Sequence, residues 1–140
     1  MPPLSILLKP ASSGCNLRCA YCFYADEAKA RTIPNYGRMP EAVSHALIEK
    51  AVKAAEGSVT FLFQGGEPTL AGLDFFRDFA AHVKKTAPPS LTVYYAIQTN
   101  GTLLDEEWCR FFKENRFLAG LSLDGSRECH NRFRLDGAGK

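Results

Sequence analysis

The chain has 140 residues, enough for one domain and too few for two of ordinary size. Hydrophobic residues make up 46% of it and charged residues 23%, the balance of a globular protein, and the formal net charge is only +2. No block of Lys and Arg, no apolar run of membrane-spanning length and no basic region ahead of the short apolar N-terminal stretch is present, which argues against nucleic acid, a membrane and a signal peptide. We therefore expect a cytoplasmic protein whose cysteines stay reduced.

The first predicted element is a short apolar strand at residues 4–8. Residues 10–38 follow without sustained periodicity and are interrupted by prolines and glycines, which predicts a long loop. A loop of this length in a compact domain is usually functional. It carries three closely spaced cysteines, Cys15, Cys19 and Cys22.

Helices and strands then alternate along the chain. The remaining predicted elements, in order, are a helix from Pro40 to Gly57, a strand at 59–63, a helix at 73–86, a strand at 91–97, a helix N-capped by Asp105 and a strand at 117–123. Strand 59–63 is a continuous apolar run, which favours burial on both faces. The alternation predicts an α/β fold in which helical crossovers connect the strands of a parallel sheet.

Two details of packing follow from the helical patterns. Val43, Leu47 and Ala51 fall on one face of the first predicted helix, so we expect them to face the core. Cys109 stands beside Trp108 in the third, and we expect it to fill space in the core.

Polar segments follow the carboxyl end of each predicted strand. After the cysteines of the first loop come Gln64–Pro68, Gln98–Gly101 and Ser122–Gly125. In parallel α/β sheets and barrels, binding sites are built at this edge. The sequence therefore predicts one pocket formed by all four segments.

The cysteine pattern C-x3-C-x2-C favours metal or cluster ligation, because an odd total of five cysteines with three clustered does not suit a disulfide framework. Zinc prefers four ligands, and none stands at motif spacing, since the next thiols are Cys109 and Cys129. Iron–sulfur clusters take cysteine thiolates at short loop spacings. A cluster with one iron free of protein is therefore the favoured interpretation, with zinc and unliganded thiols as alternatives.

This spacing, with Tyr21 before the last cysteine and Phe23 and Tyr24 after it, resembles the radical S-adenosylmethionine superfamily. In that superfamily three cysteines hold a [4Fe–4S] cluster, and the fourth iron is chelated by the amino and carboxylate groups of S-adenosylmethionine. Reduction cleaves the cofactor to methionine and a 5′-deoxyadenosyl radical, which takes a hydrogen atom from the substrate. The resemblance implies two cofactors, the cluster and S-adenosylmethionine, with Cys15, Cys19 and Cys22 as metal ligands.

A second segment, Gly65-Gly66-Glu67-Pro68, resembles the glycine–glycine–glutamate–proline motif of the superfamily. Glycine lacks a Cβ, so main-chain groups can approach the ammonium group of the cofactor closely. The alternative is an ordinary turn at the end of a strand. The resemblance makes Gly65, Gly66 and Glu67 cofactor-binding residues.

By the same resemblance Tyr21, Ser122 and Arg134 complete the S-adenosylmethionine site. Ser122 is expected to contact the ribose or the carboxylate, and the guanidinium of Arg134 matches the geometry of a carboxylate. Ser122 could instead be a local backbone partner, and Arg134 a solvated surface arginine that is easily confused with Arg132.

The resemblance is narrower for three stretches: Lys-Pro-Ala-Ser-Ser-Gly-Cys-Asn-Leu-Arg-Cys-Ala-Tyr-Cys-Phe-Tyr, Phe-Gln-Gly-Gly-Glu-Pro-Thr-Leu-Ala-Gly and Gln-Thr-Asn-Gly-Thr-Leu-Leu-Asp-Glu. They are similar to the anaerobic sulfatase-maturating enzymes, which oxidise a cysteine or serine of a sulfatase polypeptide to Cα-formylglycine. That family implies a sulfatase substrate, with Tyr24 and Gln64 on the substrate side, and an electron donor such as a flavodoxin or ferredoxin.

The chain departs from this family in extent. The family has a (β/α)6 barrel, and only about four strands are predicted here, with a loop and no helix after the last of them. We therefore expect a partial barrel in which residues 1–140 form a C-terminally truncated radical SAM core. The auxiliary-cluster domain and the catalytic acid of the family lie beyond residue 140, so we expect the chain alone to assemble the first cluster without completing turnover.

Three rival functions remain open from the sequence. One is a different radical peptide modification, such as thioether formation. Another is a non-catalytic iron–sulfur electron carrier, which would have no use for Gly65, Gly66 and Glu67. The last is an interaction module stabilised by zinc.

Overall fold

The computed structural model describes residues 3–139. Its elements, in chain order, are β1 (Leu4–Leu8), α1 (Phe23–Lys29), α2 (Glu41–Ala54), β2 (Ser58–Phe63), the 3-10 turn η1 (Pro68–Ala71), α3 (Leu73–Thr86), β3 (Thr92–Thr99), α4 (Glu106–Glu114), β4 (Phe117–Leu121) and α5 (Arg127–Phe133). Among these residues, no helix has the length and apolar character needed to cross a bilayer.

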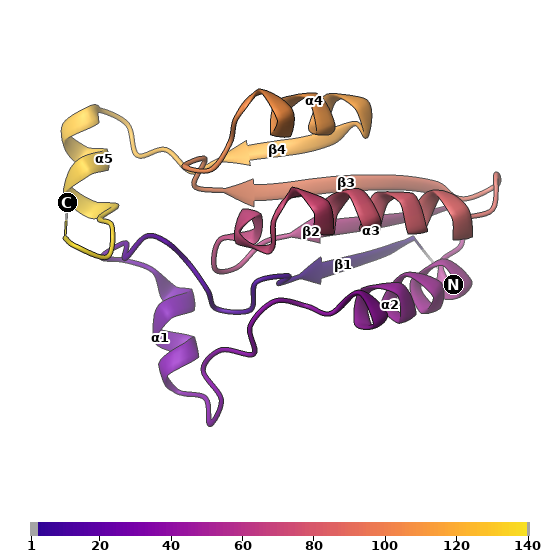
Figure 1. Ribbon diagram of the computed structural model, residues 1–140, viewed down its shortest axis with the longest axis horizontal. Helices are drawn as coiled ribbons and strands as arrows, with labels where there is room; N and C mark the ends of the chain where they lie inside the picture. The colour runs from indigo at the N-terminus through magenta and orange to yellow at the C-terminus, as the bar shows by residue number, and fades with distance from the viewer. Residues whose placement is uncertain (1–2, 140) are drawn as a thin grey trace.

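The strands form one parallel sheet in the order β1-β2-β3-β4. All four point the same way in Figure 1, so their carboxyl ends meet at one edge of the sheet. Each of α2, α3 and α4 connects a strand to its neighbour, as the alternating pattern predicts. The predicted α/β fold with a parallel, partial barrel is thus confirmed.

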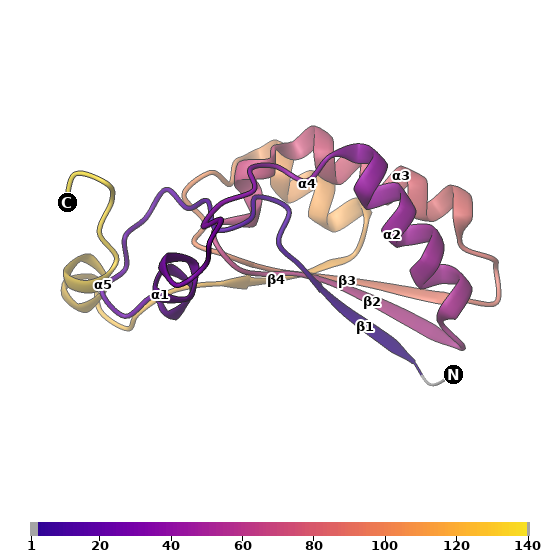
Figure 2. The same ribbon diagram turned by 90° about the horizontal axis from the view of Figure 1, so that it is seen from below.

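Helices α2, α3 and α4 all lie against the same face of the sheet (Figure 2). The core between these two layers is aromatic: Phe61 and Phe63 of β2 pack against Phe76 and Phe79 of α3. Trp108 of α4 extends the cluster by an edge-to-face contact with Phe76. Such contacts add to the free energy gained by burying the rings, and they fix the helical layer on the sheet.

The opposite face of the sheet has no helix over it in the described part of the chain (Figure 2). Burial accordingly alternates along β2, and on the open side Tyr94 of β3 is 55% exposed and Leu118 of β4 is 75% exposed. The prediction that strand 59–63 is buried on both faces is therefore wrong. A continuous apolar run does not reveal whether a second layer is present.

Two short helices stand inside segments that the sequence predicts to be loops. Helix α1 begins directly after Cys22, and α5 follows the β4 end, which Leu121 forms two residues earlier than predicted. The expectation that no helix follows the last strand is wrong. Both helices lie beyond the carboxyl ends of the strands (Figure 1), so they border that edge of the sheet and do not pack across its face as the crossover helices do.

Two packing predictions also need correction. The buried residues of α2 are Ser44, Ile48 and Ala51, whereas Val43 is 51% exposed, so the apolar face is rotated from the predicted one. Cys109 is exposed rather than part of the core. The cap of α4 is as predicted, since the Asp105 carboxylate accepts a hydrogen bond of 3.0 Å from the Trp108 N–H.

Candidate active site at the carboxyl edge

A cavity of about 270 Å³ lies where the carboxyl ends of the strands meet α1 and the segment after α5. All of the residues singled out from the sequence line it: Cys15, Cys19, Cys22, Tyr21, Tyr24, Gln64, Gly65, Gly66, Glu67, Ser122 and Arg134. Five more residues complete the wall: Leu17, Phe23, Gln98, Thr99 and Asn100. Segments far apart in the chain therefore form one pocket, as the strand-end pattern predicts.

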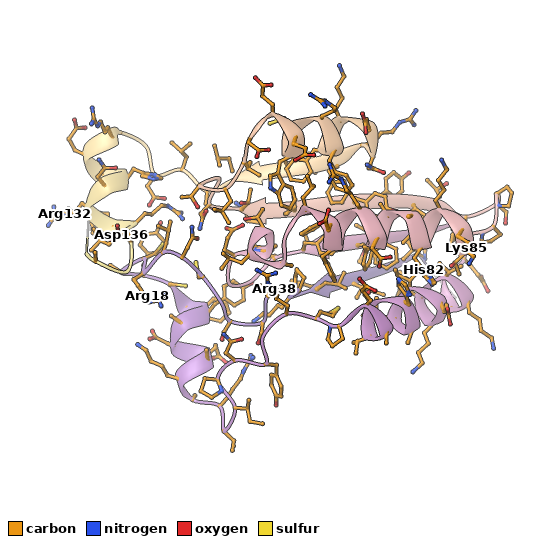
Figure 3. The ribbon with its side chains drawn as sticks, in the orientation of Figure 1. Arg18, Arg38, His82, Lys85, Arg132 and Asp136 are labelled. Atoms are coloured by element: carbon orange, nitrogen blue, oxygen red, sulfur yellow. The ribbon has the colours of Figure 1, made fainter. Side chains whose placement is uncertain are left out.

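The cysteine loop is held between two other segments. On one side the Glu67 N–H donates to the carbonyl of Gly14 over 2.7 Å. On the other side Leu17 pairs with Asp136 in an antiparallel bridge, and the Ala20 N–H donates to the carbonyl of Phe133. In Figure 3, Arg18 and Asp136 lie at the same end of the molecule, where these two segments meet. The loop that carries the thiols is thus fixed by main-chain hydrogen bonds.

Several N–H groups point at the cysteine sulfurs. The Leu17 N–H lies 3.4 Å from Cys15 Sγ, Asn100 Nδ2 lies 3.9 Å from the same atom, and Arg134 Nη1 lies 3.9 Å from Cys19 Sγ. Burial raises the pKa of Cys15, opposed by the Leu17 N–H; burial raises the pKa of Cys19 as well, opposed by the charge of Arg134. N–H donors stabilise the thiolate, the form that binds metal.

The three thiols are the side chains of the cavity that can ligate an iron–sulfur cluster. Within residues 3–139, no group of three or more His, Cys, Asp and Glu side chains is arranged to hold one metal ion. The three half-buried thiols line one cavity, and N–H donors lie near the sulfurs of Cys15 and Cys19. Cysteine thiolates are the usual protein ligands of iron–sulfur clusters, so these residues can together hold one.

Gly66 lies against the backbone of the cysteine loop. Its φ is +62°, and a Cβ built on it would stand 2.4 Å from the carbonyl oxygen of Gly14 and 2.9 Å from that of Ser12. No side chain other than hydrogen fits there without displacing main chain. Glycine is therefore required at position 66 by the close packing of this segment against the cysteine loop, whether or not a ligand is bound.

Glu67 is 1% exposed, and its carboxylate joins the ends of two strands. Its Oε1 accepts hydrogen bonds from the N–H and hydroxyl of Thr69 and from the hydroxyl of Thr99, at 2.6 to 3.0 Å. Its Oε2 accepts one from the Asn100 N–H at 2.8 Å. The carboxylate thus places Asn100, whose amide then reaches Cys15.

Ser122 and Gln98 form a pair across β3 and β4. Gln98 Nε2 donates to Ser122 Oγ over 2.8 Å, so the Ser122 proton remains free for an acceptor in the cavity. Gly120 stands between them in the register, and a Cβ there would lie 2.3 Å from Gln98 Oε1. The glycine lets the Gln98 side chain cross the face of β4.

Arg134 is held by Asp124, a residue of the predicted pocket segment Ser122–Gly125 for which the sequence predicted no role of its own. Both Nε and Nη2 donate to the carboxylate of Asp124, at 3.0 and 3.1 Å, and the Tyr21 hydroxyl donates to the same carboxylate. Only the position of an acid directly after a strand end could have pointed to Asp124, and that signal is weak. Arg132 instead stacks on Phe133, and it lies on the outside of α5 in Figure 3.

The histidines take no part in the cavity lining. His45 of α2 and His82 of α3 stack with ring centroids 3.8 Å apart, and His45 pairs with Asp78 at 2.7 Å. Figure 3 places His82 near the far end of α3. His82 Nε2 lies 3.3 Å from Glu49 Oε1 without the alignment of a hydrogen bond. These side chains connect two helices, as structural histidines do.

Comparison with known proteins places this geometry in a family. The family described as the radical SAM superfamily matches residues 10–137. A cysteine-type anaerobic sulfatase-maturating enzyme of Clostridium novyi is 52% identical over 136 residues, which are 97% of this chain and 36% of that enzyme. A serine-type enzyme of Klebsiella aerogenes is 36% identical over 138 residues, or 34% of its length. The chain thus spans about a third of the length of these curated relatives.

Solved structures agree with the sequence comparison. Native anSMEcpe with bound AdoMet superposes with a TM-score of 0.91 at 49% identity, over 98% of this chain and 37% of the other. Native anSMEcpe with bound AdoMet and the Kp18Cys peptide gives a TM-score of 0.90. Because the family match extends over residues 10–137, which is most of the chain and includes the cysteine loop and every residue that lines the cavity, the chain belongs to the radical SAM superfamily.

Proposed function

We propose that the chain forms the cofactor-binding part of a radical SAM enzyme, holding a [4Fe–4S] cluster through Cys15, Cys19 and Cys22. The observation that carries this proposal is the convergence of the three thiols on one cavity with the ends of β2, β3 and β4. The cluster, when bound, supplies the electron for reductive cleavage of S-adenosylmethionine. The protein contributes the position of the ligands, N–H donors to the sulfurs and a pocket that shields the reaction from water.

The S-adenosylmethionine site in this proposal comprises Tyr21, Gly65, Gly66, Glu67, Ser122 and Arg134. Ser122 offers a free hydroxyl proton to a ribose or carboxylate oxygen, and Arg134 offers a guanidinium edge to a carboxylate. The buried carboxylate of Glu67 already accepts its hydrogen bonds from protein, so its contribution is to shape the wall. Tyr24 and Gln64 line the same cavity and are assigned to the substrate side.

For the reaction we propose oxidation of a sulfatase side chain to Cα-formylglycine, with a flavodoxin or ferredoxin as electron donor in the cytoplasm. Identity is 52% to a cysteine-type enzyme and 36% to a serine-type enzyme, which favours cysteine as the oxidised residue. The catalytic acid of this chemistry is assigned, from family resemblance, to a position beyond residue 140.

Anaerobic reconstitution with iron and sulfide tests the cofactor proposal. We expect about four irons and four sulfides per chain, and an EPR signal of the reduced protein that changes when S-adenosylmethionine is added. Single Cys→Ala substitutions at Cys15, Cys19 and Cys22 should abolish the cluster, while Cys109→Ala and Cys129→Ala, which remove exposed thiols elsewhere, should not. A colourless protein, or a signal indifferent to S-adenosylmethionine, would contradict the proposal.

The reaction is tested separately, with sulfatase peptides that differ only in a Cys or Ser at the target position. The protein that contains this domain should form formylglycine from the cysteine peptide in preference to the serine peptide, measured by mass spectrometry. Thioether formation on either peptide would instead favour a different radical modification.

A further inference from the structure

Asp124 lies just beyond β4 and collects three donors from two other segments. Its Oδ2 accepts from Arg134 Nε at 3.0 Å and from the Tyr21 hydroxyl, and its Oδ1 accepts from Arg134 Nη2 at 3.1 Å. The Asp124 N–H itself lies 3.5 Å from His130 Nδ1 of α5. The carboxylate thus links the cysteine loop, the end of β4 and the residue that ends α5.

The pair is sheltered, since the side chains of Arg134 and Asp124 are 13% and 24% exposed. A two-point contact between guanidinium and carboxylate restricts orientation far more than a single hydrogen bond does. Arg134 shifts the pKa of Asp124 downward, and the Tyr21 hydroxyl adds to this, so the carboxylate stays ionised.

Main-chain hydrogen bonds bring Arg134 next to the cysteine loop, but they do not fix the direction of its side chain. The neighbouring carbonyls of Phe133 and Leu135 accept hydrogen bonds from Ala20 and Arg18 of that loop. An arginine side chain has several rotatable bonds, and ordering them costs rotamer entropy. The contact with Asp124 offsets that cost before any ligand arrives.

One edge of the guanidinium remains available. Nε and Nη2 are engaged with Asp124, whereas Nη1 points toward Cys19 Sγ at 3.9 Å. Arg134 lines the cavity and Asp124 does not. Asp124 can therefore influence a ligand in the cavity only through the residues that it holds.

We propose that Asp124 is a positioning residue, which locks Arg134 so that its Nη1 edge is presented beside Cys19 to the carboxylate of S-adenosylmethionine. The inference rests on the proposed function, because it takes that molecule as the ligand. Asp124 would thus determine how strongly the site prefers a ligand with a carboxylate over one without it, although Asp124 itself contacts neither ligand. Without Asp124, Arg134 would still attract an anion, but its side chain would have to be ordered on binding, which costs binding free energy.

The test compares S-adenosylmethionine with decarboxylated S-adenosylmethionine, which lacks only the carboxylate. Dissociation constants of both are measured anaerobically on the reconstituted protein, together with iron content and thermal stability. The preference is expressed as the dissociation constant of the decarboxylated ligand divided by that of S-adenosylmethionine. In Asp124→Asn this ratio should fall by about tenfold or more, tenfold being the lower end of what a hydrogen bond to a charged group contributes. Asp74→Asn, which removes a carboxylate from the surface pair with Arg77, should leave the ratio unchanged.

A double-mutant cycle tests whether Asp124 acts through Arg134. If Asp124 acts through Arg134, the variant carrying both Asp124→Asn and Arg134→Gln should have the same ratio as Arg134→Gln alone. Asp124→Glu keeps the charge and shifts the contact by one methylene, so it should fold and give an intermediate ratio. It is the variant to use should Asp124→Asn lose its iron.

The outcomes separate the two proposals. An unchanged ratio in both Asp124 variants would overturn the inference, and so would equal weakening of both ligands, which is what a general structural role produces. Additive effects of the two substitutions would also overturn it. If the wild-type protein binds neither the cluster nor S-adenosylmethionine, the proposed function itself fails, and no substitution is needed to see it.

Discussion

At the scale of single residues, the cavity depends on side chains whose partners are other protein groups. Glu67 is the clearest case, because four donors from three residues surround its buried carboxylate. Resemblance predicts it as a cofactor-binding residue, and in the structure its carboxylate connects the ends of two strands. The side chain therefore shapes the cavity wall through contacts within the protein.

Substitution Glu67→Gln tests this role. The amide would bring an NH₂ group against N–H and O–H donors in a site without water access, so we expect a loss of about 2 to 3 kcal/mol in the free energy of unfolding. The change is measured by urea denaturation. Glu114→Gln, at an exposed position of α4, should change stability by less than about 0.5 kcal/mol, and equal losses in the two variants would contradict the structural role of Glu67.

Glycines 66 and 72 offer a matched pair. Both have positive φ, at +62° and +89°, but a Cβ at Gly72 meets nothing within 4 Å, whereas one at Gly66 meets the backbone of the cysteine loop. Gly72→Ala should therefore cost only the backbone strain, about 1 to 3 kcal/mol. Gly66→Ala should cost more and also lower the iron content after reconstitution, because the loop must move. Iron content equal to wild type in Gly66→Ala would contradict this account.

At the scale of elements, the helices divide into those that form the core and those that form the site. Helices α2, α3 and α4 pack on the sheet with buried apolar side chains. Helix α5 buries no residue at all, and α1 buries only Ala28. Helix α5 therefore depends on its Ser126 cap, whereas α1 has no side-chain cap, and both rely on main-chain contacts between the segments beside them.

Removing helix caps should separate these two classes. Ser126 Oγ accepts from the Cys129 N–H at the start of α5, and the Asp105 carboxylate does the same for Trp108 at the start of α4. Asp105→Ala should lower global stability by about 1 kcal/mol. Ser126→Ala should leave global stability nearly unchanged, yet it should speed amide hydrogen exchange in α5 and weaken S-adenosylmethionine binding through Arg134. Faster exchange across the whole sheet in Ser126→Ala would show that α5 belongs to the cooperative core instead.

The same division explains what the sequence could predict. The crossover helices and strands carry apolar periodicity, so their order and the carboxyl-edge pocket were predictable. Helix α1 has the sequence Phe-Tyr-Ala-Asp-Glu-Ala-Lys and α5 has Arg-Glu-Cys-His-Asn-Arg-Phe, with no apolar stripe in either. Neither helix was therefore predicted. The role of Asp124 was not predicted, because its partners, Tyr21 and Arg134, are brought to it by tertiary structure alone.

At the scale of the whole molecule, the half-buried phenol of Tyr95 makes the stability of the fold depend on pH in the alkaline range. Burial raises the pKa of Tyr95 to about 12, compared with about 10 in an unfolded chain. Between these values the unfolded chain releases the proton and the folded chain retains it, so stability falls as the pH rises from about 10 to about 12. Below about pH 10 the phenol is neutral in both states and the contribution is fully present.

Urea denaturation at about pH 8 and about pH 11 measures this effect, which cannot exceed about 2 to 3 kcal/mol. Tyr95→Phe keeps the stacked contact with Phe117, at 4.8 Å between ring centroids, and should reduce the alkaline loss. Tyr94→Phe, on the open face of the same strand and 55% exposed, should retain the wild-type loss. Identical pH profiles for the wild type and Tyr95→Phe would refute the assignment.

The bridge between the cysteine loop and the segment after α5 has a consequence for biosynthesis. Cys19 and Arg134 are 115 positions apart in the chain, so the three cysteines leave the ribosome well before the segment that carries Arg134. At about 5 to 20 residues per second, the nascent loop waits about 6 to 23 seconds for that segment. During this interval the loop lacks both the main-chain hydrogen bonds from Phe133 and Leu135 and the guanidinium beside Cys19. The cavity is therefore expected to close only after the segment beyond α5 has left the ribosome.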